Sequence, residues 1–216
     1  MKNKHTHYIY ASFALLLFVA LGYMVKFYPE ALTGFDSNIQ TWVRGDLPGG
    51  LTAFFKMITT LGNTSVQAVI TILAVICLYL RQYKAEAIFV GTSGVLASIM
   101  IMSLKYIYQR PRPSITHLVH AGGYSFPSGH SLGTFMILGA IAIVLAQRLA
   151  KKESKIAVYG ITGLLIFLVG LSRIYVGVHY PTDVLAGFTL AFGLLNAIYP
   201  TYDRIRFEWR FQSKQK

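Results

Sequence analysis

The feature that most constrains this chain is a series of six apolar runs, each about as long as a helix that crosses a lipid bilayer. They lie near residues 8–28, 64–81, 86–104, 131–149, 156–172 and 182–200. A spanning helix needs about 20 mostly apolar residues, because the hydrocarbon offers no water to exposed backbone groups. We therefore expect an all-α fold: an integral membrane bundle of six transmembrane helices, forming a single membrane-embedded domain over residues 1–216.

The composition and the placement of charge agree with that class. Hydrophobic residues make up 54% of the chain and charged residues 13%, against about 25% charged in soluble proteins. The formal net charge of +12 could indicate a nucleic-acid or membrane partner. The single cysteine, Cys77, lies inside the second run, so no internal disulfide can form.

The positions of the basic residues account for the net charge. Thirteen of the 20 Lys and Arg residues lie on one side of a six-span bundle, which the positive-inside rule assigns to the cytoplasm. We therefore expect both termini in the cytoplasm and no binding of nucleic acid. The thirteen are Lys2, Lys4, Arg81, Lys84, Arg148, Lys151, Lys152, Lys155, Arg204, Arg206, Arg210, Lys214 and Lys216.

Seven basic residues do not follow this rule. Lys26 can extend from the end of the first run to the interface. Arg44 and Lys56 lie in GFDSNIQTWVRGDLPGG and LTAFFKMITTLG, which we expect to form short interfacial helices on the outer face, where neither residue needs a further role. The other four need a different explanation: Lys105, Arg110, Arg112 and Arg173.

The first of three polar clusters is KYIYQRPRP, which follows the third run. Pro111 and Pro113 stop the helix, so Lys105 lies on its last turn and Arg112 in the loop beyond. Taken alone, these two residues could be interfacial anchors.

The second cluster, YSFPSGHS, precedes the fourth run. Pro127 suits a helix start, and Gly129 lets the backbone approach a ligand. We expect the free N–H groups of Ser128, Gly129 and His130 to form an anion site at the positive end of the helix. A simple capping turn is the alternative, but a cap does not need the histidine.

The third cluster, SRIYVGVHYPTD, joins the fifth and sixth runs. Arg173 ends one run and Pro181 starts the next. Asp183 follows His179 by four residues, a spacing that one helical turn would bring together. Pro181 disfavours helix in the residue before it, which leaves this contact open. An acid in the first turn would also suit the helix dipole without any further role.

Topology brings the three clusters to one membrane face, because the third and fifth runs end there and the fourth and sixth begin there. Ionisable residues at span ends that face a bundle interior are functional candidates. The cationic side chains of Lys105, Arg112 and Arg173 match a phosphate group, which carries about −1.5 to −2, better than a single carboxylate. The sequence therefore predicts a phosphate site at the outer face.

The two histidines of these clusters indicate catalysis as well as binding. His179 can attack phosphorus if Asp183 orients it and stabilises its positive charge. His130 has no carboxylate nearby in sequence, so we assign it as the acid that protonates the leaving oxygen and the base that then activates water. This chemistry requires no metal and no cofactor.

The remaining histidines do not complete a metal site. His117 and His120 have a spacing that could bind zinc, but no acid or cysteine lies near them in the sequence, and we expect exposed loop residues. His5 and His7 are expected in an N-terminal tail.

Together the clusters resemble the three motifs of the type 2 phosphatidic acid phosphatase superfamily. These are Lys, six residues and Arg-Pro; Pro-Ser-Gly-His; and Ser-Arg, five residues, His, three residues and Asp. In this chain they are KYIYQRPRP, PSGH and SRIYVGVHYPTD, within residues 105–183, and every motif position is filled.

The resemblance implies an all-helical, metal-independent membrane phosphatase. It implies that Lys105, Arg112, Ser128, Gly129 and Arg173 cradle phosphate, and that His179, backed by Asp183, forms a phosphohistidine while His130 frees the leaving group. It is greatest to bacterial enzymes that act on phosphatidylglycerol phosphate, phosphatidic acid or undecaprenyl diphosphate. The implied partners are such a lipid and the bilayer, with no obligatory protein partner.

Three other hypotheses compete with the hypothesis of a lipid phosphatase. Vanadium haloperoxidases share a similar cradle, but they are soluble. A transporter site usually lies near the bilayer midplane, whereas these charges lie at one face. A lipid-binding protein without activity would not need His130, His179 and Asp183.

Overall fold

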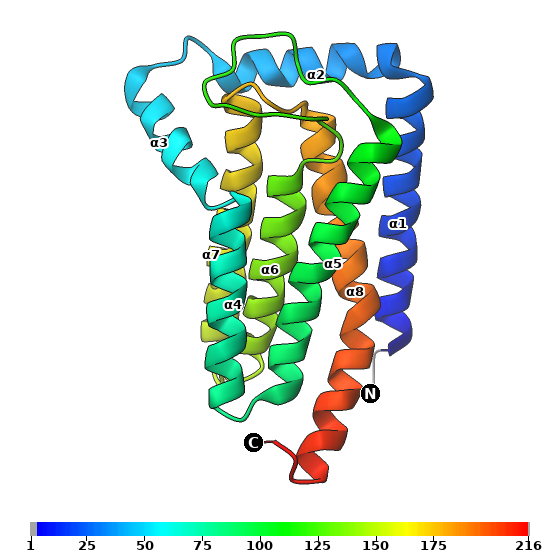
Figure 1. The fold of residues 1–216 in the computed structure, drawn as a ribbon, viewed down its shortest axis with the longest axis vertical. Helices are drawn as coiled ribbons and strands as arrows, with labels where there is room; N and C mark the ends of the chain where they lie inside the picture. The colour runs from blue at the N-terminus through cyan, green and yellow to red at the C-terminus, as the bar shows by residue number, and fades with distance from the viewer. Residues whose placement is uncertain (1–3, 216) are drawn as a thin grey trace.

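The structure, a computed structural model, describes residues 4–215, and these residues form eight helices and no strand (Figure 1). Five helices are long and apolar enough to cross a membrane, and α3 with α4, bent by 50° between them, makes a sixth candidate span. The helices are α1 Lys4–Phe27, α2 Pro29–Arg44, α3 Gly49–Thr60, α4 Thr64–Leu80, α5 Lys84–Tyr108, α6 Gly129–Ala146, α7 Lys152–Tyr175 and α8 Pro181–Phe211. The all-α bundle expected from the apolar runs is confirmed.

Helix boundaries follow the local chemistry of the chain. Pro29 and Pro181 occupy the first turns of α2 and α8, where the missing N–H has no helical partner to lose. α5 ends at Gln109, whose left-handed backbone lets its N–H bond the Lys105 carbonyl, and prolines follow. α8 runs to Phe211, well past the apolar run, and its polar end carries the ion pairs Asp203–Arg206 and Arg204–Glu208.

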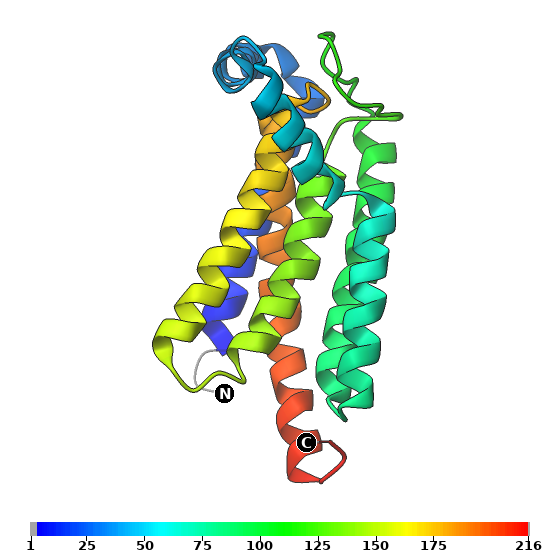
Figure 2. The ribbon, with the colours of Figure 1, turned by 90° about the vertical axis from the view of Figure 1, so that its left-hand side faces the viewer.

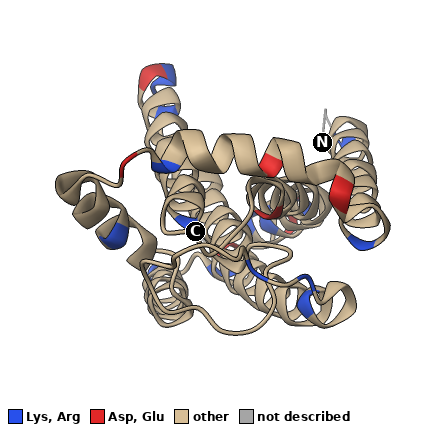
Figure 3. Cartoon of the chain, turned by 90° about the horizontal axis from the view of Figure 1, so that it is seen from above, with Lys and Arg blue, Asp and Glu red and all other residues tan. Residues whose placement is uncertain are grey.

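The spanning helices stand side by side, and α2 lies across one end of them (Figure 1). α8 packs between α1 and α6, while α4 and α5 stand together to one side of the bundle (Figure 2). α3 descends from α2 and packs on α7. Seen from above, α2 and the loops cover this end of the upright helices (Figure 3).

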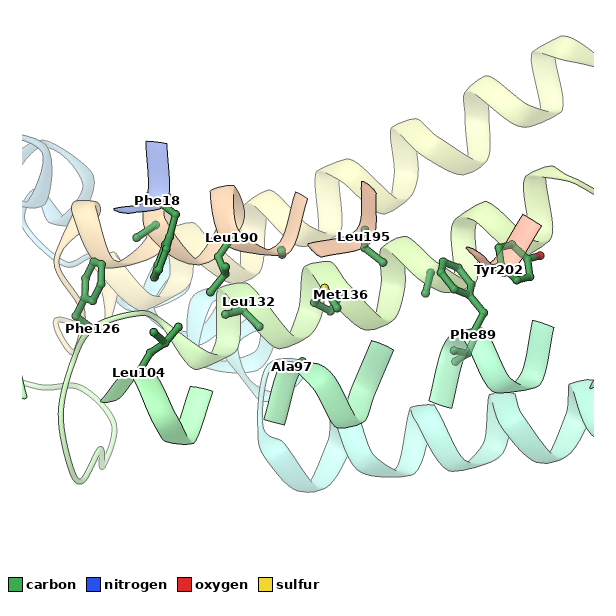
Figure 4. Close-up of a cluster of buried hydrophobic side chains, with 14 of the residues drawn as sticks. Phe18, Phe89, Ala97, Leu104, Phe126, Leu132, Met136, Leu190, Leu195 and Tyr202 are labelled. Atoms are coloured by element: carbon green, nitrogen blue, oxygen red, sulfur yellow. The ribbon is translucent and has the colours of Figure 1, made fainter. Parts of the chain in front are cut away.

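Close packing between α6 and α8 fixes the end of the bundle that lies under α2. Leu132 and Met136 of α6 are fully buried between α5 and α8 (Figure 4). In lipid the hydrophobic effect does not drive helices together, so small residues that allow close contact matter more. A Cβ at Gly187 would lie 3.0 Å from the Ser128 carbonyl oxygen and from Ser131 Cβ. Gly187 thus lets the first turns of α6 and α8 touch.

The charged ends of the bundle agree in part with the expected topology. The segments that join α4 to α5 and α6 to α7 lie together at the end opposite α2, where α1 begins and α8 ends (Figure 1). Lys2 and Lys216 lie outside the described residues. Lys26 donates to the carbonyls of Ile107 and Tyr108, so it caps the end of α5.

The expectation that His5 and His7 belong to a tail is wrong, because α1 already begins at Lys4. His7 Nδ1 lies 2.8 Å from Asn196 Oδ1 of α8, and its ring packs on Tyr199. The last turns of the apolar run in α8 thus give the first turns of α1 a surface to pack against.

Candidate active site

A cavity of about 640 Å³ lies between α4, α5 and the start of α6, next to the loop that joins α5 to α6. Its polar end is lined by Lys105, Arg112, His130, Arg173 and His179, together with the backbone at Gly129. Its apolar part runs between α4 and α5. The three sequence clusters therefore meet around one volume, as the topology predicted.

His179 and Asp183 are in contact, which the sequence had left open. His179 Nδ1 lies 3.2 Å from Asp183 Oδ2, and both side chains are buried. The same oxygen accepts the Tyr180 N–H at 2.9 Å, so Asp183 also closes the first turn of α8. His179 lies in the turn before α8, and burial lowers its pKa well below the ordinary value, with Arg173, Arg112 and Lys105 adding to the effect. The ring is therefore neutral and keeps a lone pair.

The three predicted cations line the same cavity as this histidine. Arg112 Nη1 lies 3.4 Å from His179 Nε2 and donates to the Val178 carbonyl at 2.7 Å. Lys105 Nζ donates to the Tyr124 carbonyl at 2.7 Å. Arg173 Nη1 donates to Thr59 Oγ1 at 2.6 Å, while its buried Nε has no acceptor within the described part of the chain. The site thus concentrates positive charge and includes one buried donor without an acceptor.

The start of α6 differs from the expected row of three free N–H groups. Ser128 is the N-cap, and its N–H donates to the Asp183 carbonyl at 3.0 Å, so the expectation for that group is wrong. Its hydroxyl oxygen accepts from Ser131 Oγ at 2.9 Å. The close packing of α6 on α8 at Gly187 brings the Ser128 N–H to Asp183 instead of to the cavity. Gly129 and His130 do line the cavity.

The corner between α3 and α4 contacts His130. The sequence did not indicate that this corner would belong to the site. Asn63 Oδ1 lies 3.1 Å from His130 Nε2. A Cβ at Gly62 would collide with the His130 ring, so only glycine fits there. The sequence feature that could have indicated this corner is the Gly62-Asn63 pair, which lies between an expected interfacial helix and the second apolar run.

Two arginines outside the cavity, one in α2 and one in the loop after α5, support the site in ways that the sequence did not predict. Arg44, expected to have no further role, donates to the carbonyls of Tyr175 and Thr116 at 3.0 and 2.9 Å. It thereby ties α2 to the end of α7 and to the loop over the site. Arg110, left without an assignment, is buried and donates to Asp183 Oδ1 at 2.7 Å.

The loop histidines remain at the rim. His117 is exposed, and its Nε2 lies 2.9 Å from the Pro113 carbonyl oxygen. His120 is exposed too, and it lines the mouth of the cavity. Between Lys4 and Gln215, no three His, Cys, Asp or Glu side chains are grouped so that they could hold a metal ion.

Comparison with known families agrees with this geometry. Residues 86–207 match the sequence model of the PAP2 superfamily, which is the type 2 phosphatidic acid phosphatase superfamily. The chain belongs to the PAP2 superfamily. All three polar clusters of this PAP2 protein lie inside the matched region.

Curated relatives and a solved structure extend the likeness. Phosphatidylglycerophosphatase B of Bacillus subtilis is 43% identical over 106 residues, which are 49% of each chain. Undecaprenyl-diphosphatase BcrC of the same organism is 32% identical over 115 residues, 51% of this chain and 54% of the relative. The match thus spans about half the length of these two relatives.

The crystal structure of a transmembrane PAP2 type phosphatidylglycerolphosphate phosphatase from Bacillus subtilis has a TM-score of 0.83 to this chain. The two are 28% identical, and the match covers 90% of this chain and 96% of that one. This PAP2 protein is therefore a multi-span membrane protein with the fold of that structure.

Proposed function

We propose that this chain is a membrane lipid phosphatase that hydrolyses the phosphate or diphosphate headgroup of a lipid through a phosphohistidine on His179. The observation that carries the proposal is the contact between His179 and Asp183 at the wall of a cavity lined by Lys105, Arg112 and Arg173. The names of the relatives, which are phosphatases of lipid phosphates, support the same class of reaction.

In the first step, His179 Nε2 attacks phosphorus. The bond from phosphorus to the oxygen of the leaving lipid alcohol or lipid monophosphate breaks, and that oxygen takes a proton from the imidazolium form of His130, which becomes neutral. The new positive charge on the His179 ring is stabilised by Asp183, which accepts from Nδ1 at 3.2 Å. Lys105, Arg112 and Arg173 stabilise the phosphoryl oxygens as their charge shifts, which is the kind of electrostatic term that dominates many enzymes.

In the second step, water attacks the phosphohistidine from the side that the leaving group occupied. His130, which now lacks its proton, takes one from this water. The bond between phosphorus and Nε2 breaks, inorganic phosphate leaves, and the lone pair returns to His179. Asn63, at 3.1 Å from His130 Nε2, positions the ring for both proton transfers.

The apolar part of the cavity suits the lipid tail. It runs from Lys105 along α4 and α5 past Met102, Val95 and Ile72. The proposed substrates are phosphatidylglycerol phosphate, phosphatidic acid or undecaprenyl diphosphate, because these share the headgroup chemistry and an apolar tail. No metal or cofactor takes part in this scheme, since the cationic side chains neutralise the phosphate.

We further propose that the whole chain works as one membrane-embedded unit with its site outside the cytoplasmic membrane and both termini in the cytoplasm. The basic segments at the end of the bundle away from α2 support this orientation by the positive-inside rule. The proposed partners are the lipid substrate and the bilayer. We propose neither a nucleic-acid partner nor an obligatory protein partner.

The test is phosphate release by purified protein in detergent from a panel of these lipid monophosphates and diphosphates. We expect turnover by the wild type and its loss in His179→Ala. His117→Ala is the matched control, because His117 is an exposed histidine of the same end that does not line the cavity. A wild type that binds these lipids and releases no phosphate would support a binding or transport protein instead.

A further inference from the structure

Arg110 connects the carboxylate of the site to α2. It lies in the loop after α5 and is buried. Nη1 donates to Asp183 Oδ1 at 2.7 Å and to Thr182 Oγ1 at 2.7 Å, while Nη2 donates to Asp36 Oδ2 at 2.8 Å. Its guanidinium also lies 3.9 Å from the centre of the Tyr180 ring. Arg110 therefore bridges two carboxylates that are 147 positions apart in the sequence.

Asp36 is the second carboxylate, and it is as closely held as the first. It is 2% exposed, on the face of α2 that packs on the bundle. Its Oδ1 accepts the Thr182 N–H at 2.9 Å, and its Oδ2 accepts from Thr182 Oγ1 at 2.8 Å as well as from Arg110. Asp36 thus caps the start of α8 and holds Arg110 in place.

The two oxygens of Asp183 have different partners. Oδ1 accepts from Arg110, and Oδ2 accepts from the Tyr180 N–H and faces His179 Nδ1. This division fixes the rotation of the carboxylate, so that one oxygen always faces the histidine. Without Arg110, two buried carboxylates would lie near each other without a cation between them, which is strongly unfavourable.

The shared guanidinium also determines how much negative charge Asp183 can offer to His179. One cation between two carboxylates neutralises each of them in part. Without Asp36, Arg110 would pair with Asp183 alone and would neutralise more of the negative charge on Asp183. The stabilisation that Asp183 gives to a positive His179 ring would then weaken, because the carboxylate would be a poorer partner for Nδ1–H.

We propose that Arg110 and Asp36 are positioning residues of this site. Arg110 orients Asp183 toward His179 and keeps its carboxyl group ionised. Asp36 fixes the position of Arg110 and weakens the ion pair between Arg110 and Asp183. This inference rests on the proposed function. Arg110 is one of the six residues that the first motif leaves unspecified, and Asp36 lies outside residues 86–207 that match the family. Neither lines the cavity. Their effect should therefore be on turnover and not on substrate binding.

The experiment compares kcat, KM and the inhibition constant of inorganic phosphate for Arg110→Met, Arg110→Lys and Asp36→Asn. We expect kcat to fall about 10–100-fold in Arg110→Met and Asp36→Asn, the range typical of outer partners of functional histidines at metal sites. KM and inhibition by phosphate should change little, because Lys105, Arg112 and Arg173 remain. Arg110→Lys, which keeps the charge but not both contacts, should recover part of the loss.

Matched controls are Arg204→Met and Asp46→Asn, exposed residues of the same types away from the cavity. An unchanged kcat in Arg110→Met and Asp36→Asn would overturn the inference. So would a parallel loss of kcat, substrate affinity and inhibition by phosphate, which indicates general loosening of the site. If Arg110→Met does not fold, Asp36→Asn, which keeps the side-chain volume, decides alone. An inactive wild type would refute the proposed function itself, so the two failures are distinct.

Discussion

His179 turns one ring nitrogen to the carboxylate of Asp183 and the other to the guanidinium of Arg112. Nδ1 lies 3.2 Å from Asp183 Oδ2, and Nε2 lies 3.4 Å from Arg112 Nη1. Because Asp183 already accepts from Arg110 and from the Tyr180 N–H, it is an acceptor for His179 too. Nδ1 therefore carries the hydrogen, and the lone pair of Nε2 lies next to the cations that would hold a phosphate.

The first prediction concerns pH. The pKa of His179 is lowered well below its ordinary value by burial first and then by Arg173, Arg112 and Lys105. Lys105→Met removes one positive charge, so the pKa of His179 should rise. A ring that takes up its proton at a higher pH loses its lone pair earlier as the pH falls. We therefore expect the acidic limb of kcat/KM to move to higher pH in this variant.

The measurement uses an aryl phosphate, whose leaving group needs no proton from His130. Ionisation of the substrate is the same for both proteins, so the difference between the profiles reports the enzyme. Lys151→Met, at an exposed position between α6 and α7, is the control. Identical acidic limbs for Lys105→Met and the wild type would show that the charge of Lys105 does not lower the pKa of His179.

Much of this architecture can be predicted from the sequence, because an apolar run of spanning length leaves few alternatives in a bilayer. The starts of α6 and α8 and the ends of α5 and α7 follow from prolines and from the last apolar residues, so the meeting of the motif residues could be predicted too. The polar extension of α8 could not, because it packs through contacts with a distant part of the chain, such as Arg206 with Gln147.

The supporting residues were harder to predict because they come from a different part of the chain. Asp36 lies in a mostly polar helix, where an acid usually faces water. One signal was present: Leu32, Asp36 and Gln40 recur at intervals of four, and all three are buried on one face of α2. Asn63 gave no comparable signal, since its contact with His130 depends on the 50° bend between α3 and α4.

A second prediction concerns Asn63. Asn63→Ala removes the contact at 3.1 Å to His130 Nε2, and one hydrogen bond is worth about 0.5–1.5 kcal/mol. We expect up to about a tenfold loss of kcat/KM with a lipid phosphate, and a smaller loss with an aryl phosphate, whose departure needs no acid. Asn38→Ala, at an exposed asparagine of α2, is the control. An equal loss of kcat/KM with both substrates would place Asn63 outside the proton transfer to the leaving group.

A third prediction concerns metals. Lys105, Arg112 and Arg173 supply the positive charge that Mg²⁺ supplies in kinases. We expect turnover of a lipid phosphate to be unchanged after treatment with a chelator, and vanadate to inhibit because it resembles the five-coordinate transition state. If a chelator abolishes activity and a single added metal restores it, the scheme without metal is wrong.

A fourth prediction concerns orientation. In a Cys77→Ala background, His120→Cys places a thiol at the mouth of the cavity, and Lys151→Cys places one at the other end of the bundle. An impermeant thiol reagent applied to intact cells should label the first and spare the second until the cells are lysed. The reverse pattern would place the site in the cytoplasm.

The most direct measurement is the capture of a phosphoenzyme in variants of the two histidines. With an aryl phosphate, His130→Ala should still phosphorylate His179, and the label should accumulate because water attack lacks its base. General acid–base catalysis is worth about 10²–10⁴-fold, so hydrolysis of the intermediate should slow by that order. The account predicts an acid-labile phosphohistidine at His179 in His130→Ala and no label in His179→Ala. Label in His179→Ala that disappears in His130→Ala would contradict it and reverse the two roles.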